Sequence, residues 1–122
     1  MTKKRRIVEL YNFLKLARMS RMTDGERVAF CRLLRQMKPV ATEVSEAVQD
    51  AIEKAREELK DEREVMAFAD RAVDDLIGQD VDIAINTMTQ EAFDHLTLSN
   101  DWTFAQIDEL ETELVAKEKD DN

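Results

Sequence analysis

The sequence predicts a mainly α protein, with a long central helix kinked at a proline, a helical hairpin, a short extended segment and two short C-terminal helices. Only two glycines and one proline occur among 122 residues, which leaves few turns for a many-stranded sheet. Apolar residues make up 43% of the chain and charged residues 37%, a balance expected of a helical protein with a hydrated surface. Apolar residues also recur every three or four positions, which places them on one face of a helix.

The first helix is predicted over residues 7–21. Its inward face carries Ile7, Leu10, Leu14 and Ala17. A tight turn then leads to Thr23, whose hydroxyl can accept a backbone N–H while Glu26 reaches back three residues, as in a capping box. We therefore expect the central helix to begin at this point.

A single apolar stripe marks the central helix, which would be on the order of 50 Å long at about 1.5 Å per residue. The stripe consists of Met37, Ala41, Val44, Val48, Ile52, Ala55 and Leu59. Pro39 lacks a backbone donor, but the stripe keeps its phase across it and Lys38 would cap a new helix poorly. We expect a kink at Pro39 rather than a helix end. Cys31 lies inside this pattern, where a buried structural thiol is expected.

Two structures are compatible with the sequence beyond Leu59. One is a single very long helix that needs a partner chain to cover its stripe. The other is a hairpin, with Lys60 in the turn, Asp61 capping a third helix and Gly78 ending it. The third helix would bury Val65, Met66, Ala69, Ala72, Val73 and Leu76. A compact chain of this length favours the hairpin.

The apolar period changes to two over residues 80–86, where Val81, Ile83 and Ile85 alternate with polar or small residues. This pattern predicts a strand or an extended connector. No pairing strand is evident, so we expect the segment to lie along the helices or to pair with its copy in a dimer.

Two capped helices are predicted to close the chain. Thr89 caps the first, with Met88 and Phe93 at hydrophobic-staple positions. Thr103 and Gln106 form a second capping box, with Trp102 and Ile107 at staple positions. The inward residues of the last helix are expected to be Phe104, Ile107, Leu110 and Leu114.

The net charge of −9 conceals a strong asymmetry. Residues 1–38 contain 11 Lys/Arg and 3 Asp/Glu, a balance of +8, whereas residues 39–122 contain 7 Lys/Arg and 24 Asp/Glu, a balance of −17. Such a split would attract the basic end of one chain to the acidic part of the same chain or of a neighbour. We expect contacts through a basic face (Arg18, Arg21, Arg32 and Arg35) and an acidic face (Glu43, Glu46, Asp50, Glu53 and Glu57).

The sequence carries no catalytic motif. His95 is the single histidine, and no serine or cysteine stands at a motif-like spacing from it, so we expect a surface or half-packed side chain. Asp80 and Asp82 offer oxygens to a hard cation, with Asp74, Asp75 and Asn86 nearby, but Ile85 occupies the position where a calcium loop requires glycine. We expect neither a metal nor a cofactor.

A nucleic-acid interpretation competes with protein binding. Lys3, Lys4, Arg5 and Arg6 form a basic arm that could contact phosphates. The acidic remainder of the chain would repel a nucleic-acid backbone. Acidic helices can also imitate DNA, although solubility is their usual explanation. We therefore rank both interpretations below binding to a protein.

The order of these features resembles that of a family. A short helix (VELYNFLKLARM) precedes a long helix with a Met-x-Pro near its middle (ERVAFCRLLRQMKPVATEVSEA), an alternating acidic segment (DVDIAIN) and a short helix that leads into a Leu-rich one (QEAFDHLTLSNDWTFAQIDELETEL). Over residues 7–115 the chain resembles small, functionally uncharacterised proteins encoded by tailed phages and prophages. The KKRR start and the short link near Lys60 depart from that pattern. The resemblance implies a phage-derived origin and brings no catalytic residues.

These observations predict a basic arm over residues 1–6, one helical domain over 7–116 and a charged tail over 117–122. No segment reaches the roughly 18 apolar residues of a membrane span, and polar residues break the apolar run near the N-terminus, so neither a membrane protein nor a signal peptide is predicted. We expect a cytoplasmic, non-enzymatic scaffold, acting in the host cell if it is phage-encoded. Its partners would be proteins such as phage structural or assembly components, together with further copies of itself. The alternative is a nucleic-acid-associated regulator that uses the basic N-terminal region.

Overall fold

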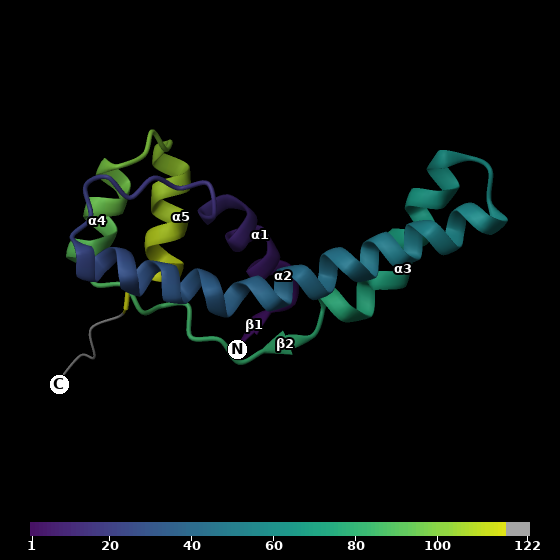
Figure 1. Cartoon of the computed structure of the whole chain (residues 1–122), viewed down its shortest axis with the longest axis horizontal. Helices are drawn as coiled ribbons and strands as arrows, with labels where there is room; N and C mark the ends of the chain where they lie inside the picture. The colour runs from purple at the N-terminus through teal and green to yellow at the C-terminus, as the bar shows by residue number, and fades with distance from the viewer. Residues whose placement is uncertain (117–122) are drawn as a thin grey trace. The chain divides into compact units, whose positions relative to one another are not determined.

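The computed structural model describes residues 1–116, which form five helices and two short strands. The elements are β1 (Thr2–Lys3), α1 (Lys4–Leu14), α2 (Asp24–Glu58), α3 (Glu62–Ile77), β2 (Asp80–Val81), α4 (Gln90–Leu98) and α5 (Phe104–Leu114) (Figure 1). The mainly α prediction is confirmed, including the long helix and the two short C-terminal helices. The predicted tail over 117–122 lies outside the described residues.

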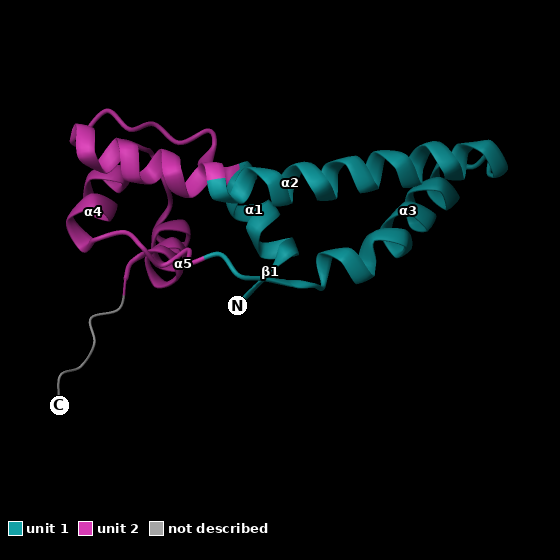
Figure 2. Ribbon diagram, turned by 60° about the horizontal axis from the view of Figure 1, so that its bottom comes forward, with its two compact units in different colours: residues 1–12, 36–83 teal, residues 13–35, 84–122 magenta. Residues whose placement is uncertain are grey.

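Two compact units divide the chain, and each contains two separate segments (Figure 2). Unit 1 consists of residues 1–12 and 36–83, and unit 2 of residues 13–35 and 84–122. The long helix α2 contributes its first part to unit 2 and its second part to unit 1. Of the residues assigned from sequence to a basic arm, 2–6 lie in β1 and in the first turn of α1.

The hairpin in unit 1 is formed by the second part of α2 and by α3, which lie side by side (Figure 1). This arrangement resolves the two alternatives left by the sequence in favour of the hairpin. Asp61 caps α3 as predicted, because its Oδ1 accepts the Arg63 N–H at 3.0 Å. Gly78 is the C-cap, also as predicted.

The hairpin is held by a narrow apolar seam of small side chains. Its buried members include Val44, Ala51, Ala55, Val65, Ala69 and Val73. Small residues allow two helices to approach closely. Met66 and Ala72 were predicted to be inward, and this was wrong: both are exposed. A hairpin of only two helices covers one narrow stripe of each, so positions beside the stripe remain in water.

Helix α2 continues through Pro39 without ending, as the unbroken phase of the stripe predicted. Met37 and Ala41, on either side of the proline, are both buried. The proline itself is exposed, so its ring does not disturb the packed face. Farther along the stripe, Val48 and Ile52 are half-buried rather than fully covered.

A two-stranded antiparallel sheet joins the N-terminus to the segment after α3. Thr2 pairs with Val81 and Lys3 with Asp80, and the Lys4 N–H donates to the Gln79 carbonyl at 2.9 Å. The prediction that the 80–86 segment lacks a partner within the chain was therefore wrong. The partner strand has only two residues, which is too short to show any alternation in sequence.

The first helix ends at Leu14, seven residues before the predicted end at Arg21. Tertiary hydrogen bonds in unit 2 replace the missing helical ones. The Arg18 N–H donates to Asn100 Oδ1 and the Arg21 N–H to Ser99 Oγ, each at 2.8 Å. The residues after α1 thus form a loop tied to the α4–α5 turn, despite an apolar spacing that suits a helix.

The core of unit 2 is formed by α2, α4 and α5. Its buried side chains include Phe30, Leu33, Phe93, Leu96, Leu110 and Leu114. Both predicted caps of the C-terminal helices are present: Thr89 Oγ1 accepts the Ala92 N–H at 3.1 Å, and Thr103 and Gln106 form the capping box. Backbone hydrogen bonds of Met88 to Leu114 (3.0 Å) and Ala116 (2.8 Å) join the start of α4 to the end of α5.

Phe104 was predicted to face the core, and this was wrong, because its side chain is 83% exposed. The neighbouring Trp102 makes the apolar contact of this turn instead. Its ring lies 5.4 Å from that of Phe13, measured between centroids. Phe104, as the first residue of α5, is left on the outside.

Candidate functional site

The acidic face predicted from the sequence is a continuous feature of α2. Glu43, Glu46, Asp50, Glu53 and Glu57 follow one another in steps of three or four along this helix, and all five are exposed. The surrounding hairpin, residues 39–77, contains 12 Asp/Glu against 5 Lys/Arg, a balance of −7. The face therefore presents a row of carboxylates in a region of like charge.

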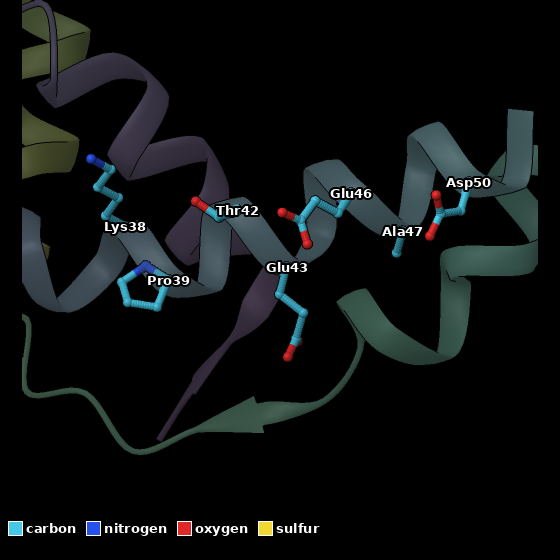
Figure 3. Close-up of a pocket in the computed structure, with 7 residues that line it drawn as sticks. All are labelled: Lys38, Pro39, Thr42, Glu43, Glu46, Ala47 and Asp50. Atoms are coloured by element: carbon cyan, nitrogen blue, oxygen red, sulfur yellow. The ribbon is translucent and has the colours of Figure 1, made fainter.

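A shallow groove of about 670 Å³, open to solvent, runs along part of this face (Figure 3). It is lined by Lys38, Pro39, Thr42, Glu43, Glu46, Ala47 and Asp50. Figure 3 shows these side chains on successive turns of α2, with the Lys38 amine near one end and the Asp50 carboxylate at the other. The short side chains of Pro39 and Ala47 leave space between the longer charged side chains, so the groove is shallow. A shallow, open groove suits contact with another protein better than binding of a small molecule.

One member of the acidic face is already paired within unit 1. The Lys4 amine lies 2.5 Å from Glu43 Oε1 and 2.9 Å from Gln79 Oε1. Lysine at a helix N-terminus is opposed by the helix dipole, so these oxygens compensate an unfavourable position. Glu46, Asp50 and Glu57 extend the face beyond this ion pair.

The N-terminal basic cluster is likewise engaged by acidic groups of unit 1. Lys3 lies 3.0 Å from Asp80 across the sheet, and Arg6 lies 3.2 Å from Glu9 on α1. The pair of Lys3 and Asp80 is a contact of the expected kind between the basic end of the chain and its acidic part, whereas Arg6 and Glu9 both belong to the basic end. Lys3 and Arg6, which the nucleic-acid interpretation requires for contacts with phosphates, therefore already have carboxylate partners.

The four arginines predicted as a basic face occupy two different segments of unit 2. Arg18 and Arg21 lie in the loop after α1, whereas Arg32 and Arg35 lie on α2. All four are exposed. The loop pair is held by the backbone hydrogen bonds to Asn100 and Ser99, so the loop presents its two arginines from a defined backbone.

Glu26 and His95 form a polar link in unit 2. The His95 Nδ1 lies 2.8 Å from Glu26 Oε1, and the same oxygen accepts the Thr23 N–H at 2.8 Å, as the predicted capping box requires. The Thr23 backbone hydrogen bond and then His95 lower the pKa of Glu26. The hydrogen bond to Glu26 raises the pKa of His95, against the opposing effect of desolvation. The pair joins the N-terminus of α2 to α4 and has the character of a structural link.

A second cavity, of about 190 Å³, lies beside this link. It is lined by Gly25, Glu26, Ala29, Phe30, Thr87, Met88, Thr89 and Ala92. Most of these groups are apolar or already satisfied by capping, so the cavity offers few free polar groups to orient a substrate.

The acidic residues considered for a cation are arranged differently from a metal site. Asp80 faces Lys3, and within residues 1–116 no three His, Cys, Asp or Glu side chains converge in a way that would hold a metal ion. Cys31 is half-buried, more exposed than the buried thiol expected from its place in the helix.

Sequence reasoning missed several features of these surfaces. Lys38, Pro39, Thr42 and Ala47 share the groove with the acidic residues. The available signal was the four-residue spacing from Lys38 to Thr42 and Glu46, and from Pro39 to Glu43 and Ala47. The link between Glu26 and His95 joins residues 69 positions apart, for which one sequence offers no signal. The exposure of Leu16, Leu98 and Phe104 was also not foreseen.

Neither protein-family models, nor curated proteins, nor solved structures match this chain. The resemblance to phage-encoded proteins thus stays a prediction. None of the helices within residues 1–116 has both the length and the apolar character needed to cross a membrane.

Proposed function

We propose that this chain is a non-enzymatic interaction protein that binds a basic segment of a partner protein along the acidic face of α2. The observation that carries the proposal is the exposed row of five carboxylates with the groove beside it. The resemblance to phage and prophage proteins adds that the partner is a structural or assembly component in the host cytoplasm.

Helical spacing makes a basic helix the natural occupant. Lysines or arginines placed every three or four residues would face the carboxylates of Glu46, Asp50 and Glu57 in register. Exposed ion pairs contribute only about 0.2–1 kcal/mol each, so the charges mainly steer and orient the partner. Affinity would come from several such pairs together with apolar contact on Pro39 and Ala47.

Binding of a basic helical peptide tests the proposal. A labelled peptide with lysines at helical spacing should bind the protein, as measured by fluorescence anisotropy, and release as salt rises from about 50 to 500 mM. A triple variant, Glu46→Gln, Asp50→Asn and Glu57→Gln, should weaken binding by about tenfold, corresponding to about 1.4 kcal/mol.

The matched control removes the same charge from α3. Asp70→Asn, Asp74→Asn and Asp75→Asn leave the α2 face intact and should change affinity far less. Equal weakening by both triple variants would show non-specific attraction to an acidic protein and would refute the assignment to α2.

The nucleic-acid-associated regulator remains the alternative function. Pairing of Lys3 with Asp80 and of Lys4 with Glu43 favours protein binding over it, because these cations already have carboxylate partners. Filter binding of DNA and RNA at two salt concentrations separates the two functions. Tight, salt-sensitive retention of nucleic acid would favour the regulator.

A further inference from the structure

Three large apolar side chains of unit 2 are exposed to an unusual degree. Leu16 is 79% exposed, Leu98 71% and Phe104 83%. One exposed leucine needs no explanation, but several large apolar side chains that are exposed on one unit together with arginines have the composition of a protein interface.

The sequence neighbours of these side chains are joined to one another. Leu16 lies two residues before Arg18, which hydrogen-bonds Asn100; Leu98 precedes Ser99, which accepts the Arg21 N–H. Phe104 follows Trp102 by two residues, and the Trp102 ring contacts Phe13. The loop after α1 and the α4–α5 turn are therefore joined, and both segments expose side chains. We call the exposed residues Leu16, Arg18, Arg21, Leu98 and Phe104 of these two segments the turn surface.

We propose that the turn surface binds helix α3 of a second copy of this chain. Helix α3 has the complementary chemistry, because it exposes 43% of Met66 and 39% of Phe68 within the acidic hairpin. Met66 lies on one helical row with Glu62 and Asp70, four positions to either side. Apolar side chains would meet the leucines and Phe104, and carboxylates would meet Arg18 and Arg21.

A second copy is favoured over a different partner because each chain carries both halves of the contact. A two-fold dimer would then contain the contact twice. Since stable interfaces bury about 1,200–2,000 Å² in total, each contact needs only about half of that area. This proposal is independent of the basic partner on α2, because it uses a different face of the hairpin.

Sedimentation equilibrium of the full chain tests the proposal. The wild type should show twice the monomer mass at about 50 mM salt and dissociate partly at about 500 mM. Phe104→Ser should raise the dimer dissociation constant by about a hundredfold or more, because each dimer buries two such rings. Met66→Ser should also weaken the dimer. Circular dichroism of both variants should match the wild type, since both side chains are exposed.

A mixture of the two variants gives the sharpest result. Phe104→Ser keeps an intact α3 and Met66→Ser keeps an intact turn surface, so the mixture retains one undamaged contact. It should associate more strongly than either variant alone. Val28→Ser, which alters an exposed apolar residue of α2, is the control and should leave the dimer unchanged.

Two outcomes would overturn the proposal. One is a monomeric wild type at low salt over the whole concentration range. The other is a dimer that neither Phe104→Ser nor Met66→Ser weakens. The anisotropy assay with the basic peptide, repeated on Phe104→Ser, tests the α2 face separately, because that variant leaves the acidic face unchanged.

Discussion

Leu96 and Leu98 lie two positions apart on α4 and differ almost completely in exposure, which makes them a matched pair for mutation. Leu96 is fully buried, whereas Leu98 is 71% exposed. Leu96→Ala removes three buried carbons at about 0.8 kcal/mol each and leaves a cavity, so the loss of stability should be about 3 kcal/mol. Leu98→Ala should change stability by less than about 0.5 kcal/mol.

Thermal and urea unfolding measure the difference. At about 4 °C per kcal/mol for a domain of this size, Leu96→Ala should lower Tm by roughly 12 °C. The single tryptophan, Trp102, belongs to unit 2, so its fluorescence follows the unit that contains the mutation, while circular dichroism follows helices in both units. High salt reduces the contribution of self-association to the measured stability.

The packing of α4 would be refuted by equal effects of the two mutations. It would also be refuted if Leu96→Ala lowered the free energy of unfolding by less than about 1 kcal/mol, because truncating a fully buried leucine in a well-packed core destabilises a protein by more than that.

Two further predictions concern stability. Because the pKa of His95 is raised, the stability that its charged form contributes is complete below its ordinary pKa of 6.5 and is lost as pH rises through the folded-state value. Because the pKa of Glu26 is lowered, the stability that its carboxylate contributes is complete above its ordinary pKa of 4.5 and is lost as pH falls through the folded-state value. The Tm difference between wild type and His95→Gln should therefore be largest between about pH 4.5 and 6.5 and shrink above that range, and a pH-independent difference would contradict the ion pair. Pro39→Ala restores a backbone N–H donor at an exposed position in the middle of α2. The free energy of unfolding measured in urea should therefore rise by about 1–3 kcal/mol. A lower free energy of unfolding would mean that the proline ring makes a favourable contact.

Local signals in the sequence predicted much of the fold. The capping residues Thr23, Asp61, Thr89 and Thr103 each act within three residues of themselves, and all four are found where expected. The stripe across Pro39 was also reliable, because a helix that keeps its phase buries the same face on both sides of the proline.

Tertiary contacts determined what the sequence could not show. The loop after Leu14 ends a helical pattern early because Ser99 and Asn100, about 80 residues away, accept its backbone N–H groups. The partner of β2 was missed because two residues of strand carry no pattern. The acidic face could be read directly from the spacing of its residues on α2, whereas the turn surface arises only when distant segments meet.

The two compact units are interleaved along the chain, since residues 13–35 of unit 2 lie between the segments of unit 1, and residues 36–83 of unit 1 lie between those of unit 2. No single contiguous stretch of the gene encodes either unit, so recombination at one site cannot transfer one of them intact. During synthesis, the ribosome completes unit 1 only after residue 83. Residues 13–35 can pack into unit 2 only once residues from 84 onward have been synthesised. Premature termination near the middle of the gene would therefore leave unit 2 without its second segment.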